Sequence, residues 1–121
     1  MHELSIAESI LDIAAAEAAT HHAAAVTTIK VRLGNFTGVV REALEFAFEI
    51  ARQGTVAASA TLEIESVPLR TRCPSCDMTG SSDFCFICER CGTPLDILSG
   101  REMQVESIEL AEEEVPWIAS R

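Results

Sequence analysis

Basic residues are scarce in this chain of 121 residues, which carries nine Lys and Arg side chains against 19 Asp and Glu. The formal net charge of −10 repels the phosphates of DNA and RNA, so the shortage argues against nucleic-acid binding. Cations and basic protein surfaces are the partners that such a chain favours. The acidic run at residues 112–114 is interpreted as a solubilising segment without a specific function.

Long apolar runs are also missing. No uninterrupted apolar stretch approaches the roughly 18 residues of a membrane-spanning helix. The first residues carry Glu3, Glu8 and Asp12 in place of the basic region of a secretory signal. We therefore expect a soluble cytoplasmic protein with no membrane partner. Because the cytoplasm is reducing, its cysteines would serve as thiolate ligands and would not form disulfides.

Four of the five cysteines form two Cys-x2-Cys knuckles, which are separated by 11 residues. Two such knuckles supply four thiolates, the ligand set of a tetrahedral structural zinc site. Redox-active thiols are the alternative, but redox Cys-x2-Cys pairs usually stand alone near a βαβ unit. The spacing therefore predicts a zinc site formed by Cys73, Cys76, Cys88 and Cys91.

The fifth cysteine, Cys85, is left over. Cys88, Cys91 and Gly92 already reproduce a knuckle with a glycine turn, so Cys85 is interpreted as a small apolar residue and not as a ligand. Four thiolates saturate zinc and leave no open coordination position for water. No histidine or carboxylate pair is spaced as an acid and a base around the site, so we expect no catalytic residues and no enzyme activity.

Apolar periodicity predicts two helices and three strands. The first helix is expected at residues 4–25, with Ser5 and Glu8 as a capping box and a short arm ahead of it. His21 and His22 would be surface residues at its end, without an acidic or cysteine partner in register. The second helix is expected at residues 38–53, with Gly54 as its C-terminal cap. Strands are expected at residues 27–33, 61–66 and 103–110. In the last strand the alternation of apolar and polar residues is interrupted near Ser107.

These elements predict an α+β fold with two helices packed on a three-stranded sheet. A small zinc-ribbon-like module would be inserted between the second and third strands. In this interpretation residues 1–69 and 102–121 form the α+β domain, and residues 70–101 form the zinc-binding module. A module of this size buries too little apolar surface to fold alone, so we expect a bound metal ion to stabilise it.

The chain begins Met1-His2-Glu3, which places several nitrogen donors close together. The α-amine of Met1 and the backbone nitrogen and imidazole Nδ1 of His2 can form adjacent chelate rings. This planar set suits Ni(II) or Cu(II) and not tetrahedral Zn(II). Glu3 is the nearest source of a fourth ligand, through its backbone nitrogen or its carboxylate. Any histidine at position two offers the same donors, so the pattern needs support from the rest of the chain.

That support comes from the order of the motifs. A strand ending in Gly34, the Phe46-x-Phe48-Glu49 segment and Gly54 lie between the amino-terminal motif and the two cysteine knuckles. In this order, and to about Leu110, the chain resembles the HypA/HybF family. The resemblance implies a nickel metallochaperone for maturation of NiFe-hydrogenase, with a HypB-type GTPase and the hydrogenase large subunit as partners. It implies exchangeable Ni(II) at Met1, His2 and Glu3, and structural Zn(II) at Cys73, Cys76, Cys88 and Cys91.

One departure from the family and one alternative function stay open. Relatives often carry an acidic residue where this chain has Val40, with Glu42 two places on, so a further carboxylate ligand from this region is left open. A zinc-stabilised protein-interaction adaptor with an inert amino terminus explains the cysteines equally well. The sequence also leaves open the client enzyme and the choice between a monomer and a homodimer.

Overall fold

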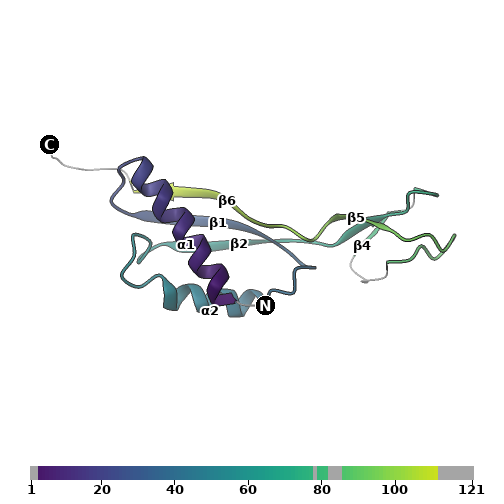
Figure 1. Cartoon of the computed structure of the whole chain (residues 1–121), viewed down its shortest axis with the longest axis horizontal. Helices are drawn as coiled ribbons and strands as arrows, with labels where there is room; N and C mark the ends of the chain where they lie inside the picture. The colour runs from purple at the N-terminus through teal and green to yellow at the C-terminus, as the bar shows by residue number, and fades with distance from the viewer. Residues whose placement is uncertain (1–2, 78, 82–85, 112–121) are drawn as a thin grey trace. The chain divides into compact units, whose positions relative to one another are not determined.

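The computed structural model describes residues 3–77, 79–81 and 86–111 of the chain (Figure 1). The predicted fold class is confirmed: two helices pack on a three-stranded sheet, and a small module with a second sheet is inserted before the last strand. The elements are α1 (Glu3–Thr20), β1 (Val26–Gly34), α2 (Arg41–Ala51), β2 (Thr61–Val67), β3 (Arg70–Arg72), β4 (Thr79–Ser81), β5 (Asp96–Ser99) and β6 (Met103–Leu110).

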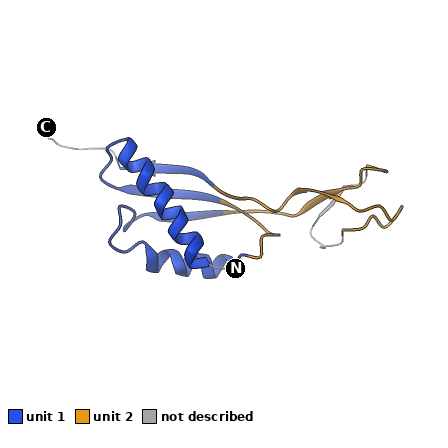
Figure 2. Cartoon of the chain, viewed as in Figure 1, with its two compact units in different colours: residues 1–31, 39–64, 105–121 blue, residues 32–38, 65–104 orange. Residues whose placement is uncertain are grey.

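The strands form two three-stranded sheets. The first has the order β2-β1-β6, and the second has the order β4-β3-β5, in which β3 pairs antiparallel with both neighbours. The chain divides into two compact units, coloured separately in Figure 2. Unit 1 comprises residues 1–31, 39–64 and 105–121, and unit 2 comprises residues 32–38 and 65–104. The sequence did not predict the three short strands of unit 2, because strands of three or four residues are too short to show an alternation.

The core of unit 1 lies between the helices and the sheet. Helix α1 buries a stripe of mostly small residues with helical spacing, made of Ala7, Ile10, Leu11, Ala14 and Ala18. Helix α2 contributes Leu44, Ala47 and Phe48, and burying a side chain like Phe48 stabilises the fold by about 2 kcal/mol. Two other apolar residues of α1, Leu4 and Ile13, lie outside this stripe and are 49% and 48% exposed.

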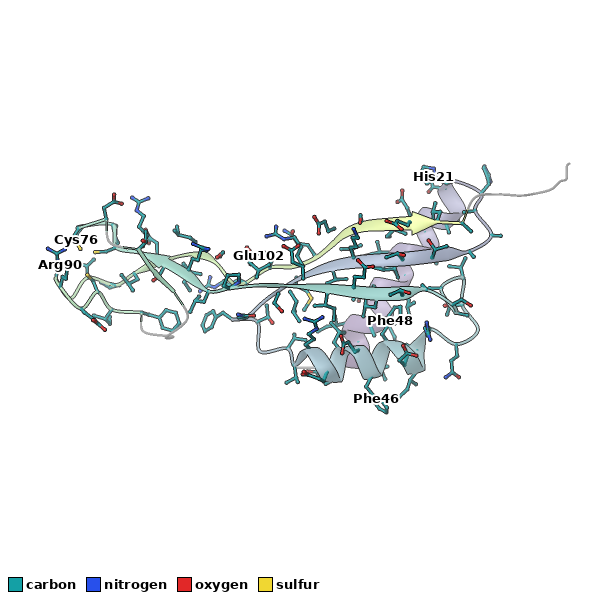
Figure 3. The ribbon with its side chains drawn as sticks, turned by 180° about the vertical axis from the view of Figure 1, so that it is seen from behind. His21, Phe46, Phe48, Cys76, Arg90 and Glu102 are labelled. Carbon is teal, nitrogen blue, oxygen red and sulfur yellow. The ribbon has the colours of Figure 1, made fainter. Side chains whose placement is uncertain are left out.

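Both ends of α1 differ from the prediction. The helix begins at Glu3, so Ser5 lies inside the first turn and does not cap it. The helix ends at Thr20 because His22 adopts a left-handed conformation (φ 54°) and Ala23 N–H donates to the Ala18 carbonyl, as in a Schellman motif. His21 is exposed as expected (Figure 3), but its Nε2 lies 3.0 Å from the Glu17 carboxylate, an acidic partner one turn back.

Helix α2 is shorter than predicted at both ends. It begins at Arg41 because Gly38 has φ 82°, which a right-handed helix excludes. Its N-cap residue, Val40, has no side-chain cap of its own, and its N–H instead donates to Glu3 Oε2 at 3.3 Å. At the other end Arg52 is the C-cap, and Gly54 lies in the turn beyond it. A carboxylate from α1 thus accepts a hydrogen bond at the start of α2.

The strands follow the predicted alternation closely. Ile29, Val31 and Leu33 of β1 are buried while the residues between them are half-buried or exposed. In β6 the more buried positions are Val105, Ile108 and Leu110. The alternation of buried and exposed residues is therefore interrupted near Ser107, as expected. No helix in the described part of the chain is long and apolar enough to cross a membrane.

Two glycines allow backbone segments of unit 2 to approach closely. A Cβ atom at Gly34 would lie 2.1 Å from the carbonyl oxygen of Gly100. The approach is held by hydrogen bonds of 2.7 Å from Gly34 N–H to the Glu102 carbonyl and from Phe36 N–H to the Gly100 carbonyl. The Glu102 carboxylate accepts the Gly100 N–H at 2.8 Å, and this bond is the main reason that the pKa of Glu102 lies below its usual value.

Replacing Gly34 with alanine tests this approach. We expect Gly34→Ala to lower the free energy of unfolding by about 3 kcal/mol, because the new methyl group meets a backbone carbonyl that cannot move aside. Gly54→Ala is the control: unlike Gly34, Gly54 has a positive φ of 77°, which costs an alanine some strain, but nothing lies within 4 Å of the new atom, so the loss should be about 1 kcal/mol. Urea denaturation measures both. Equal losses would contradict the role of Gly34.

Candidate metal centre

The four cysteines of the two knuckles converge in unit 2. Their Sγ atoms all lie within 4.8 Å of one another. The closest pairs cross between the knuckles: Cys73 and Cys91 are 3.4 Å apart, and Cys76 and Cys88 are 3.5 Å apart. Figure 3 shows Cys76 at the end of the module, on the turn that follows β3. The predicted ligands are therefore brought together by the fold.

The two knuckles share one backbone design. In each, the residue after the second cysteine donates its N–H to the carbonyl of the first: Asp77 to Cys73 and Gly92 to Cys88, both at 2.8 Å. Both donors have a positive φ, 62° for Asp77 and 73° for Gly92. The Asp77 carboxylate also pairs with Arg72 Nε at 2.9 Å, which helps to hold a residue other than glycine in this conformation.

The cluster has the size of a tetrahedral zinc site. A zinc–thiolate bond of about 2.3 Å implies a separation of about 3.8 Å between sulfurs at the corners of a tetrahedron. The observed separations, from 3.4 Å up to 4.8 Å at most, bracket that value. Such an ion would offset the charge of four thiolates, which would otherwise repel one another. The donor set fits a structural metal with all four positions filled by sulfur.

The environments of Cys91 and Cys88, in the second knuckle, favour thiolates. The pKa of Cys91 is lowered to about 6, mainly because the Thr93 hydroxyl, 3.1 Å from Cys91 Sγ, hydrogen-bonds to the sulfur. The pKa of Cys88 is also lowered, first by the backbone N–H of Cys91 and then by that of Arg90. A lower thiol pKa means that fewer protons must be displaced when a metal binds. Cys73 and Cys88 are buried and Cys91 is exposed, so the site has an inner and an outer side.

Sequence reasoning missed Thr93 and Asp77 as parts of this site. Thr93 also lies within 3.4 Å of the Ser75 hydroxyl, so its side chain connects the two knuckles. Its position two residues after Cys91 gave no signal of that contact. The role of Asp77 could have been predicted from the sequence. Asp77 follows the second cysteine of its knuckle, as Gly92 does in the other, and Asp tolerates the left-handed conformation better than most residues.

The predicted amino-terminal site is described only in part. Met1 and His2 lie outside the described residues, and so does Cys85. Glu3 is the first residue of α1, and its Oε2 accepts the Val40 N–H at 3.3 Å. One carboxylate oxygen of Glu3 therefore already accepts a hydrogen bond from the N-cap residue of α2. Glu42, two places on, is exposed in the first turn of α2.

Comparison with known proteins identifies the family. Residues 1–110 match the family described as "Hydrogenase/urease nickel incorporation, metallochaperone, hypA". The chain belongs to the HypA family. The hydrogenase maturation factor HypA of Synechococcus elongatus is 40% identical over 111 residues, covering 91% of this chain and 99% of that protein. The hydrogenase maturation factor HypA of Chloroflexus aggregans is 42% identical over 112 residues, covering 90% and 98%.

Solved structures of HypA proteins have the same fold. The solution structure of the Ni metallochaperone HypA from Helicobacter pylori matches with a TM-score of 0.68 and 25% identity, over 93% of this chain and all of that one. A second HypA solution structure matches with a TM-score of 0.71 at 25% identity, over 93% and 98%. The family match ends at residue 110, so the last 11 residues of this chain lie beyond it.

Replacing Thr93 tests the electrostatic design of the cysteine site. We expect Thr93→Val to raise the pKa of Cys91 toward its ordinary value, so that zinc binding must displace about one additional proton between roughly pH 6 and 8. Zinc affinity should then fall more steeply in the variant than in the wild type as the pH is lowered. Competition with a chromophoric chelator measures the slope. Thr93→Ser keeps the hydroxyl and should behave as the wild type; equal slopes for all three proteins would contradict the role of Thr93.

Proposed function

We propose that this protein is a nickel metallochaperone that binds Ni(II) at its amino terminus and delivers it during maturation of NiFe-hydrogenase. The observation that carries the proposal is the family match over residues 1–110, which spans both Met1-His2-Glu3 and the four-cysteine cluster. A zinc-stabilised adaptor would need only the cysteines. The metallochaperone uses both motifs, which is why we favour it.

Nickel is cargo and must be exchangeable. The Met1 amine and the backbone and imidazole nitrogens of His2 supply three donors of a planar set. Glu3 supplies the next donor, and its backbone nitrogen is the more available group because its carboxylate already accepts the Val40 N–H. A short set of ligands at a chain terminus can be given up one at a time to a competing site, which suits a protein that transfers a metal.

Zinc is a structural ion in this proposal. Cys73, Cys76, Cys88 and Cys91 hold it within the module of residues 70–101, while residues 1–69 and 102–121 form the nickel-binding domain. A site filled by four sulfurs holds no water that could act as a nucleophile, so we assign the protein no enzymatic activity. The partners that follow from the function are a HypB-type GTPase and the hydrogenase large subunit, and the site of action is the cytoplasm.

Three zinc-loaded proteins test the amino-terminal nickel site. The wild type with its native terminus should bind about one Ni(II), as measured by calorimetry. His2→Ala should lose this binding, because it removes the imidazole donor, and so should a protein with residues added ahead of Met1, because the α-amine then becomes an amide. Zinc content should stay at one per chain in all three.

A fourth protein separates the two possible roles of Glu3. Glu3→Gln retains an oxygen that can accept the Val40 N–H but has no carboxylate charge, so nickel binding through the backbone nitrogen should persist. If all four proteins bind nickel equally, the amino-terminal site is incidental and the adaptor function replaces the proposal.

A further inference from the structure

Helix α2 carries an apolar stripe that faces away from the core. Ala43, Phe46 and Ile50 have the spacing i, i+3 and i+7, which places them on one side of the helix. Phe46 is 68% exposed and Ile50 is 52% exposed. Figure 3 shows Phe46 on the side of α2 away from the strands, whereas Phe48 lies on the side toward them. An exposed Phe and an exposed Ile one turn apart are typical of a surface that a partner covers.

A second stripe of acidic side chains runs beside the apolar one. Glu42, Glu45 and Glu49 repeat the same spacing one residue earlier along the helix. Glu45 pairs with Arg41 at 3.3 Å and Glu49 with Arg52 at 2.8 Å, while Glu42 makes no ion pair with the described residues. The outer surface of α2 therefore offers apolar contacts along one line and negative charge along the next.

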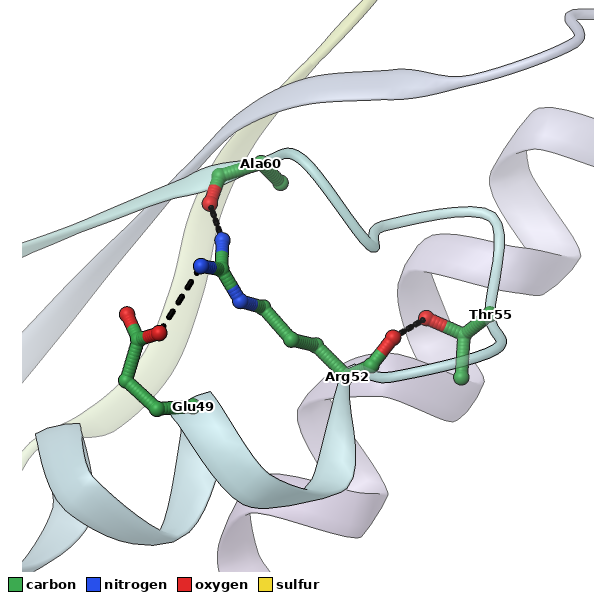
Figure 4. A network of polar contacts seen from close by, with 4 residues as sticks. All are labelled: Glu49, Arg52, Thr55 and Ala60. Atoms are coloured by element: carbon green, nitrogen blue, oxygen red, sulfur yellow. Dashed lines mark hydrogen bonds and ion pairs between the residues drawn. The ribbon is translucent and has the colours of Figure 1, made fainter.

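A hollow of about 490 Å³ borders the acidic stripe on its other side. Arg52 lies at its edge: the guanidinium donates to the Ala60 carbonyl and to Glu49 Oε1 (Figure 4). The guanidinium carbon also lies over the Phe48 ring, 5.9 Å from the ring centre. The hollow is lined by the Glu45 and Glu49 carboxylates and by the Arg52 guanidinium, so its lining carries one net negative charge. Its lining consists of Glu45, Phe48, Glu49, Arg52, Ser59, Ala60, Thr61 and Leu62.

Charge decides what kind of molecule covers this surface. Unit 1 contains 13 of the 19 acidic residues and four of the nine basic ones, so it carries a formal charge of −9. A second copy of the chain would bring the same acidic stripe against this one, and a symmetric dimer through α2 would be repelled. A partner with apolar side chains beside Lys or Arg matches both stripes.

We propose that the outer surface of α2 is a docking site for a partner protein whose contact segment carries apolar side chains flanked by Lys and Arg. The apolar side chains cover Phe46 and Ile50. The basic ones lie against Glu42, Glu45 and Glu49. This inference rests on the proposed function, because a chaperone that hands over a metal must bind the protein that receives it or the protein that drives the transfer.

The test uses the zinc-loaded full chain and two probes, the HypB-type GTPase and the unprocessed hydrogenase large subunit of the same organism. Phe46→Ser combined with Ile50→Ser should weaken binding to at least one probe by about tenfold or more, as measured by biolayer interferometry. Glu42→Gln combined with Glu45→Gln should weaken the same interaction and reduce its dependence on salt. Ile13→Ser, at a residue of α1 that is 48% exposed, is the matched control and should bind as the wild type.

Nickel and zinc contents are measured for every variant. Because Phe46 and Ile50 are exposed, their double variant should keep both metals. Failure of the wild type to bind nickel would contradict the proposed function and not the docking site. The docking site is overturned if neither probe binds the wild type, or if both bind the Phe46 and Ile50 variant as tightly as the wild type. It is also overturned if sedimentation shows a wild-type dimer that this variant dissociates, since the occupant would then be a second copy.

Discussion

The fold of unit 2 depends on the convergence of four cysteine sulfurs, which lie within 4.8 Å of one another and form a cluster that fits a metal ion. This unit has 47 residues, and its buried apolar side chains in the described part of the chain are Leu33, Val67, Leu69 and two of the cysteines themselves. So small a core cannot stabilise three short strands alone. A metal bound to the four sulfurs would add the missing free energy, and the matching turns at Asp77 and Gly92 hold the sulfurs close enough to share one ion.

Unit 1 is stabilised differently, by packing two helices on a sheet. Its buried side chains are mostly Ala, Leu, Ile, Val and Phe, and no metal is needed to hold them. The start of α2 is completed by Glu3 from α1, which joins the first residue of one helix to the N-cap of the other. The proposed nickel ligands therefore adjoin a residue with a structural role, and this favours a backbone donor over a carboxylate at position three.

The sequence predicted the fold where the signal was local. Alternating residues located β1, β2 and most of β6, and the cysteine spacing indicated the four residues that the fold brings together. The prediction failed at helix ends and in short strands. The positive φ of His22 ends α1 earlier than the apolar periodicity predicts, and the positive φ of Gly38 makes α2 begin later. Strands β3, β4 and β5 exist because they pair with one another around the cysteines, and that pairing joins residues far apart in the chain.

By itself the sequence determined the ligand chemistry and the order of the elements, because the identity and spacing of side chains are local properties. Four thiolates in two knuckles specify a soft, closed metal site whatever surrounds them. The tertiary structure alone decided which apolar residues are buried, that Thr93 lies beside Ser75 of the other knuckle, and that Gly34 meets Gly100. It also left Phe46 exposed one position away from the buried Ala47. These outcomes follow from contacts between segments distant in sequence, so the packing of the whole chain was needed to reveal them.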